Sequence, residues 1–240
     1  MTTPRPNPNP IYDTFAPTAL KGRVALINAV ADTALAEPLA HELGRLGASV
    51  AICSPNPLAY QPILHELLVL GRHALAFPCD GDYDQITQGV DRVVGRWGKI
   101  DLLVNLATLP AEAPAESLTI AAWHATMDQV LHSSWYFCQT AGKHMIARAG
   151  GVIVSVLSDE GTRVRPETVH TAAAKAGVSN LTKTLSAEWG RHNIRVNSVL
   201  VPGPGVEHRP TLQHVAWATV FLATDAASYI TGECLDLTGG

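Results

Sequence analysis

The feature that most constrains the fold is a regular alternation of short apolar runs with longer amphipathic stretches, which begins at Arg23 and continues to the carboxyl end. The runs have the length and β-branched content of buried strands: VALINA, SVAIC, HALAFPC, IDLLVNL, GVIVSVL, IRVNSVLV and ECLDL. Helices are expected between them, up to about Gly47 and over about 58–71, 84–97, 119–148, 170–190 and 211–223. Such alternation predicts an α/β fold in one domain, with a Rossmann-like, doubly wound, seven-stranded parallel sheet.

The chain has 240 residues, 47% of them hydrophobic, which is enough for one well-buried domain. We expect that domain to span residues 21–240. Residues 1–20 form a predicted disordered tail, because their five prolines cannot join a helix or sheet interior: Pro4, Pro6, Pro8, Pro10 and Pro17.

Charge and composition exclude several function classes. The net charge is −4 without a cluster of lysines and arginines, which argues against nucleic acid as a partner. The chain has no apolar run long enough for a membrane span and no leader pattern at its start, so a cytoplasmic location is expected and a membrane partner is not. Neither the four cysteines nor the ten histidines show a metal-ligand spacing, so no metal site is predicted.

The segment from Gly150 to Gly190 brings three polar residues together. An apolar strand ends at Leu157 and opens into a loop that begins with Ser158, and the next helix carries Thr171 and Lys175. Residues four apart share a helix face, so Thr171 and Lys175 look the same way, towards the loop. A reaction centre, if one exists, is expected here.

This spacing resembles the short-chain dehydrogenase/reductase family, whose signature is a serine, a tyrosine about a dozen residues later and a lysine four after that. In the family the tyrosine is the general acid/base, the lysine lowers its pKa and holds the nicotinamide ribose, and the serine binds the substrate oxygen. Ser158 and Lys175 match, but Thr171 stands where the tyrosine should be. A phenol has a pKa near about 10 and an aliphatic hydroxyl is a far weaker acid, so Thr171 cannot inherit that role. His170 is an alternative acid, although one residue turns it about 100° around the helix.

The family's glycine-rich turn after the first strand is also altered. Aligned from Val24, its three glycine positions hold Ala29, Thr33 and Leu35. Their side chains would hinder close approach of a pyrophosphate, and Asp32 adds a negative charge beside an anion site. Pro38 is harmless only within the first helical turn.

Other family positions are mixed. Asp80 matches the aspartate beside the adenine, and Asn105 matches part of the motif after the fourth strand, but Val130 replaces the family's catalytic asparagine. Glu207 or His208 replaces the pyrophosphate-binding threonine, and only VEHRPTLQ stands where the family inserts a mobile lid. The second strand ends in SVAIC-Ser54 without a charge that would select NAD or NADP.

The resemblance therefore implies an inactive member that binds no cofactor and acts as a structural or regulatory subunit beside an active paralogue, or else as a homo-oligomer. Small residues on the fifth helix suit such an interface: Ala172, Ala173, Ala176 and Gly177. Two alternatives remain open. One is a working NAD(P)-dependent oxidoreductase on an alcohol, ketone or 3-hydroxyacyl-type substrate, with Asp80, Asn105, Ser158 and Lys175 as its remaining site residues. The other is a sensor for a different small molecule.

Overall fold

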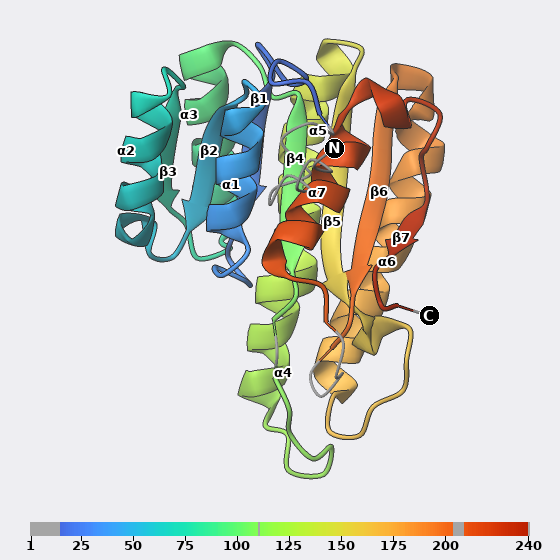
Figure 1. The fold of residues 1–240 in the computed structure, drawn as a ribbon. Coiled ribbons are helices and arrows are strands. Elements are labelled where there is room, and N and C mark those ends of the chain that lie inside the picture. Colours follow the sequence, from blue (N-terminus) through green and yellow to red (C-terminus); the bar gives the residue numbers. More distant parts are fainter. Residues whose placement is uncertain (1–14, 110, 204–208, 240) are drawn as a thin grey trace, which may run out of the picture.

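The computed structural model describes residues 15–109, 111–203 and 209–239. Seven strands form one parallel sheet in the order β3-β2-β1-β4-β5-β6-β7 (Figure 1). They are β1 (Val24–Asn28), β2 (Ser49–Ser54), β3 (Ala74–Pro78), β4 (Leu102–Ala107), β5 (Gly151–Ser158), β6 (Ile194–Val201) and β7 (Cys234–Asp236). The predicted doubly wound seven-stranded sheet is confirmed. The strand order reverses between β1 and β4, where a crevice opens at the carboxyl edge of such sheets.

Helices cover both faces of the sheet (Figure 1). On one face, α1 (Ala36–Arg45), α2 (Gln61–Val69) and α7 (Leu212–Ala223) pack on a core that includes Ile27, Ile52 and Val104. On the other face, α3 (Tyr83–Trp97), α5 (Ser133–Ala147) and α6 (Val169–Trp189) pack on Leu26, Leu103 and Ile153. Successive strand residues point to opposite faces, and the unbroken apolar runs seen in the sequence supply both cores.

The long helix expected over 119–148 is interrupted. It begins as α4 (Ile120–Thr126), with the Thr119 hydroxyl accepting the Ala122 N–H, and it becomes a π-helical stretch over Met127–His132 before α5 starts. Val130 lies within this stretch and is fully buried. The stretch is notable because π-helical turns recur beside functional sites.

The first described residues fold back onto the domain. Residues 15–20 form turns, the Leu20 side chain is 2% exposed in the core, and its N–H donates to the Leu46 carbonyl at 2.9 Å. The remainder of the predicted tail, residues 1–14, lies outside the described residues. The described domain therefore includes at least Leu20.

The small residues on α6 divide between two environments. Ala173 and Ala176 are exposed, whereas Gly177 is so close to Leu131 that an added Cβ would come within 2.9 Å of its side chain. Association through the exposed part of this face stays a prediction. Within the described part of the chain, no helix is long and apolar enough to span a membrane, and no cluster of His, Cys, Asp and Glu could hold a metal ion.

Candidate active site

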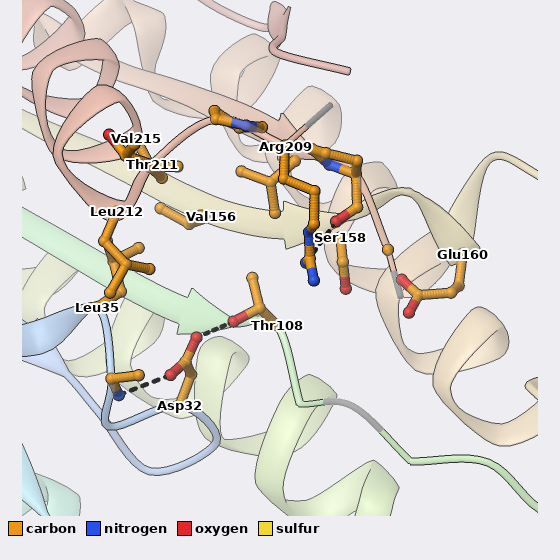
Figure 2. A pocket seen from close by; sticks show the side chains of 15 residues that line it. Asp32, Leu35, Thr108, Val156, Ser158, Glu160, Arg209, Thr211, Leu212 and Val215 are labelled. Atoms are coloured by element: carbon orange, nitrogen blue, oxygen red, sulfur yellow. Dashed lines mark hydrogen bonds between the residues drawn. The ribbon is translucent and has the colours of Figure 1, made fainter. Parts of the chain in front are cut away.

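A cavity of about 490 Å³ lies at the carboxyl edge of the sheet (Figure 2). The turn after β1, the ends of β4, β5 and β6, and the first turn of α7 supply its walls, through residues that include Asp32, Thr108, Ser158, Glu160 and Leu212. This is the switch point where α/β sheets bind their ligands. Residues 204–208 lie outside the described residues, and α7 begins four residues after them.

Ser158 is the last residue of β5, and its side chain lines the cavity. The residue is 4% exposed, and its Oγ has no hydrogen-bond partner among the described residues. Buried hydroxyls are normally bonded, because leaving one unsatisfied costs about 1–3 kcal/mol. An unpartnered hydroxyl at a cavity wall is therefore a candidate ligand-binding group.

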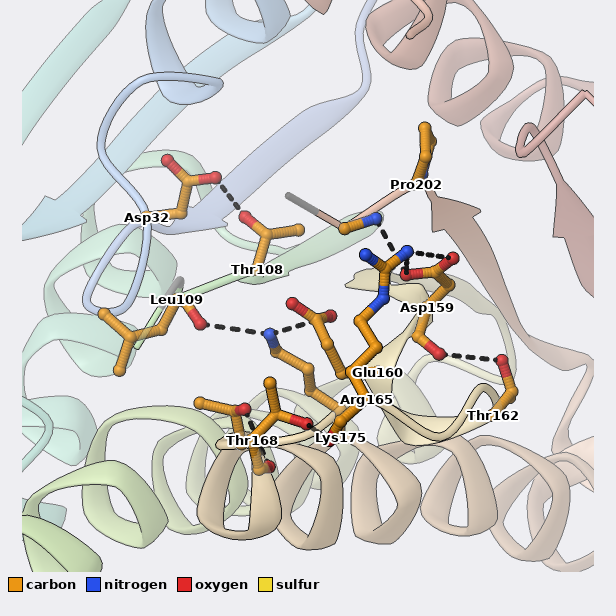
Figure 3. A network of polar contacts seen from close by, with 12 residues as sticks. Asp32, Thr108, Leu109, Asp159, Glu160, Thr162, Arg165, Thr168, Lys175 and Pro202 are labelled. Atoms are coloured by element: carbon orange, nitrogen blue, oxygen red, sulfur yellow. Dashed lines mark hydrogen bonds and ion pairs between the residues drawn. The ribbon is translucent and has the colours of Figure 1, made fainter. Parts of the chain in front are cut away.

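Lys175 comes from α6 and is fully buried behind the cavity wall. Its Nζ donates to the Leu109 carbonyl at 3.0 Å and lies 3.2 Å from Oε2 of Glu160 (Figure 3). Burial lowers the pKa of the Lys175 ammonium, and the neighbouring Glu160 carboxylate opposes that change. Glu160 lines the same cavity as Ser158, so it links the two residues that the sequence placed together.

The other two candidates on α6 do not line the cavity. The Thr171 hydroxyl is completely buried and donates to the Thr168 carbonyl of its own helix at 3.0 Å. His170 is 2% exposed, and its Nδ1 has no partner among the described residues. Burial lowers the pKa of the His170 imidazole, and the charge of Lys175 adds to the effect. Neither residue is among those that form the cavity.

Sequence reasoning missed the two carboxylates that follow Ser158. Asp159 is fully buried, accepts the Gly203 N–H at 2.7 Å and bonds Nη2 of Arg165 through both oxygens at 3.1 Å (Figure 3). Asp159 therefore links the loop after β5 to the Pro202-Gly203 turn after β6 through a hydrogen bond. Two adjacent acids directly after a strand end, upstream of the lysine on the next helix, were the sequence signal that could have indicated them.

The turn after β1 closes without glycine. The Asp32 carboxylate accepts the Ala34 N–H at 2.8 Å through one oxygen and the Thr108 hydroxyl through the other (Figure 2). Positive φ outside glycine occurs, among the described residues, at Ala149, Glu167 and Asn193, none of which lies in this turn.

The three glycine positions are therefore filled without backbone strain. Ala29 and Leu35 are buried in the core, and Thr33 is exposed. Pro38 is the third residue of α1, within the first turn, where its missing N–H does no harm.

At the remaining family positions, the side chains form hydrogen bonds with nearby residues or pack in the core. Asp80 is exposed and accepts the Asp82 N–H at 3.1 Å. The Asn105 side chain accepts from Asn28 at 3.1 Å, across paired positions of β1 and β4. Val130 packs in the small apolar cluster beneath the cavity. Their roles towards a cofactor stay predictions, and Glu207 and His208 lie outside the described residues.

The donor set fits a nicotinamide cofactor at one end of the cavity. Ser158 offers an unbonded hydroxyl, and Lys175 stands behind Glu160 beside it. At the other end Asp32 takes the Ala34 N–H, a donor of the kind that turns of this type offer to phosphate. A diphosphate could accept this N–H only in place of the Asp32 carboxylate, which holds it in this structure.

The sheet order and the cavity at the switch point are those of a doubly wound α/β protein whose ligands bind at the carboxyl edge of the sheet. The chain belongs to the short-chain dehydrogenase/reductase family: the family model described as short chain dehydrogenase matches residues 23–211.

Named relatives are enzymes. The chain is 32% identical to the D-threitol dehydrogenase of Mycolicibacterium smegmatis, with 92% of this chain and 93% of that one covered. It is 31% identical to the cis-4-hydroxycyclohexanecarboxylate dehydrogenase of Sinomonas cyclohexanicum, covering 92% and 97%. A crystal structure of carveol dehydrogenase from Mycobacterium avium in complex with NAD has the same fold, with a TM-score of 0.85, 22% identity and coverage of 93% and 98%.

These similarities correct two expectations. The inactive structural or regulatory subunit is the wrong interpretation, because the family and its named relatives are dehydrogenases and reductases. The implied absence of a cofactor is likewise unsupported, because the chain belongs to a family of dehydrogenases and its relatives are named as dehydrogenases. The error came from treating each departure from the family motif as a loss of function.

Proposed function

We propose that this chain is an NAD(P)-dependent oxidoreductase that interconverts a secondary alcohol and its ketone in the cavity at the carboxyl edge of the sheet. Family membership supports the reaction class. The substrate class is supported by the two relatives, because one is named for a polyol and the other for a hydroxycyclohexane carboxylate. The substitutions at Ala29, Thr33, Leu35, Val130 and Thr171 are then changes within a working site.

In this proposal a bound nicotinamide would supply or accept hydride. The residues of the chain bind the substrate oxygen, provide positive charge and exclude water. Ser158 donates a hydrogen bond to the substrate oxygen, and Lys175 supplies positive charge beneath the reacting centre. Leu212 and Val215, in the first two turns of α7, form an apolar wall of the cavity. They exclude water there, although the connection after β6 is short.

One observation carries the proposal: the Ser158 hydroxyl is buried, lines the cavity and has no partner among the described residues. A purely structural serine in this place would be bonded or replaced by an apolar residue. The hydroxyl is instead placed to bond a substrate oxygen at the carboxyl end of β5.

Calorimetry on the purified chain with NAD⁺ and NADP⁺ tests cofactor binding. Turnover is then assayed by the formation of reduced nicotinamide with an alcohol panel of D-threitol, cis-4-hydroxycyclohexanecarboxylate and cyclohexanol. We expect saturable binding of one dinucleotide and oxidation of at least one alcohol. Absence of binding at millimolar concentrations of both dinucleotides would overturn the proposal.

The choice between NAD and NADP is open. Ser54, at the end of β2, is buried and its Oγ accepts the Asn56 N–H at 3.3 Å. It offers no carboxylate for ribose hydroxyls and no cation for a 2′-phosphate. We therefore expect weak discrimination, with dissociation constants for the two dinucleotides within about tenfold, which is about 1.4 kcal/mol.

A further inference from the structure

Glu160 places a carboxyl group at the wall of the cavity that holds the Ser158 hydroxyl (Figure 2). It lies two residues beyond Ser158, in the short 3₁₀ turn Asp159–Gly161 that follows β5. Its side chain is 3% exposed, and Oε2 lies 3.2 Å from Nζ of Lys175 (Figure 3). The ion pair fixes the carboxyl group in one orientation.

Gly203 packs closely against this carboxyl group. A Cβ built at Gly203 would come within 3.1 Å of both the carboxyl carbon and Oε1 of Glu160, and within 2.7 Å of Oδ1 of Asp159. Gly203 itself lines the cavity. A side chain at position 203 would therefore collide with the Glu160 carboxyl group, so glycine allows that group to stay at the cavity wall.

The other titratable groups near Ser158 are placed less well for proton transfer. Lys175 is fully buried and its ammonium donates to the Leu109 carbonyl and to Glu160. His170 is not among the residues that form the cavity, and Asp159 is bonded by Arg165. Asp32 also lines the cavity, but it belongs to the turn after β1 and bonds Ala34 and Thr108.

We infer that Glu160 is the catalytic acid/base of this enzyme, with Lys175 behind it, in the role that a phenol fills elsewhere in the family. The inference rests on the proposed oxidoreductase function and adds a residue to it. Ser158 holds the substrate oxygen while Glu160 exchanges the proton. A carboxylate can do this chemistry where Thr171 cannot, because general bases must have a pKa within reach of the working pH.

In oxidation, the alcohol O–H proton passes to the Glu160 carboxylate, and the electrons of that bond form the second bond of the ketone. The C–H hydrogen leaves as hydride, with its electron pair, to the oxidised nicotinamide. In reduction, the protonated Glu160 returns its proton to the oxygen as hydride reaches the carbon. Between oxidative turnovers the proton passes from Glu160 to water, and the carboxylate keeps its ion pair with Lys175.

The test compares Glu160→Gln with the wild-type chain. Glutamine keeps an oxygen that accepts from Lys175 but cannot take a proton, so kcat should fall at least about 100-fold. The dissociation constant of the dinucleotide, measured by calorimetry, should stay within about threefold, since Glu160 acts on the substrate oxygen. The acid-side fall of kcat/KM in the wild-type pH profile should disappear, and Glu160→Asp should restore part of kcat.

Glu188→Gln is the matched control, because Glu188 is an exposed acid of α6 that does not line the cavity, and it should leave all these values unchanged. A Glu160→Gln variant that turns over within about fivefold of wild type overturns the role of Glu160 and leaves the proposed function intact. Failure of the wild-type chain to bind either dinucleotide overturns the proposed function itself. If Glu160→Gln does not fold, Glu160→Ala decides: a variant without the carboxyl group that turns over within about fivefold of wild type contradicts the role.

Discussion

Asp32 and Thr108 join the turn after β1 to the end of β4, because the Thr108 hydroxyl donates to one oxygen of the Asp32 carboxylate while the other oxygen accepts the Ala34 N–H at 2.8 Å (Figure 2). In this arrangement a side-chain anion lies where the fold receives the diphosphate of a dinucleotide. The Asp32 carboxylate and a bound diphosphate are both negatively charged, so they would repel each other if both accepted from the Ala34 N–H and the Thr108 hydroxyl.

We predict that Asp32→Asn strengthens dinucleotide binding by about tenfold, or about 1.4 kcal/mol. Asparagine keeps the acceptor for the Ala34 N–H and removes the negative charge. Calorimetry with NAD⁺ and NADP⁺ measures the change. Glu37→Gln is the control, because Glu37 is an exposed acid in the first turn of α1 that does not line the cavity, and its effect should be smaller. Equal or weaker binding by Asp32→Asn would show that the carboxylate does not compete with the cofactor.

The buried pair of Glu160 and Lys175 should couple strongly in stability. Lys175→Met leaves the Glu160 carboxylate buried without its cation, which should lower the free energy of unfolding by about 3–5 kcal/mol. The double variant Glu160→Leu/Lys175→Met should recover at least about 1 kcal/mol of the summed single losses. Urea denaturation of the wild-type chain, Lys175→Met, Glu160→Leu and the double variant gives the coupling free energy of the pair. If the losses of the two single variants simply add in the double variant, the coupling is contradicted. Lys183→Met, an exposed change on α6, should stay within about 0.5 kcal/mol.

Most of the fold could be predicted from the sequence, because strand and helix periodicity differ and the apolar runs are uninterrupted. The apolar run at Val24–Asn28, for example, predicts a strand without reference to the rest of the chain, and the structure has a strand there. The π-helical stretch around Val130 could not be predicted, since it depends on how the helix is held by its neighbours. The closure of the turn after β1 by Asp32 and Thr108 joins residues that are 76 positions apart, and no local pattern indicates it.

The candidate site was predicted only in part. Ser158 and Lys175 follow from spacing along one strand and one helix, and the structure brings their segments together at the cavity. Glu160 was missed because its position depends on contacts between distant residues: an ion pair across 15 positions and close packing against Gly203.

Two glycines with opposite surroundings should respond oppositely to alanine. A Cβ at Gly161 would lie 2.8 Å from the Ala176 nitrogen and 2.9 Å from the Lys175 carbonyl carbon, both backbone atoms that cannot move aside cheaply. Gly161→Ala should therefore cost about 1–3 kcal/mol of stability. Gly95 lies exposed in α3 with open space around it, so Gly95→Ala should add up to about 1 kcal/mol. Thermal and urea unfolding measure both, and equal effects of the two variants would contradict the packing argument.

His41 should give the stability a pH dependence. Its Nδ1 lies 3.4 Å from Glu42 and its Nε2 lies 3.0 Å from Glu66 on α2, with Arg45 nearby. The hydrogen bond to Glu42, together with the attraction of Glu66 and Glu42, raises the pKa of His41 from its usual 6.5, although burial and the charge of Arg45 act in the opposite direction.

A raised pKa in the folded state gives a contribution that is complete below the unfolded value of 6.5 and is lost as pH rises through the folded pKa. His41→Gln should therefore lose about 0.5–1 kcal/mol relative to wild type in mildly acidic solution, and the difference should shrink as the solution becomes alkaline. Urea denaturation across that range measures it. Glu66→Gln should remove part of the same difference, and a difference that grows with pH would have the wrong sign.

Ser158→Ala should separate activity from stability. Because the Ser158 hydroxyl is buried without a partner among the described residues, its removal should leave the free energy of unfolding unchanged or raise it by up to about 1 kcal/mol. The same change should lower kcat/KM on the alcohol panel by at least about 100-fold, if the hydroxyl bonds the substrate oxygen. Ser134→Ala is the matched control: its hydroxyl is also buried but donates to the Val130 carbonyl at 2.5 Å. That variant should lose about 1 kcal/mol of stability and keep its turnover. A Ser158→Ala chain that is destabilised but fully active would make the hydroxyl a structural group and remove the observation on which the proposed function rests.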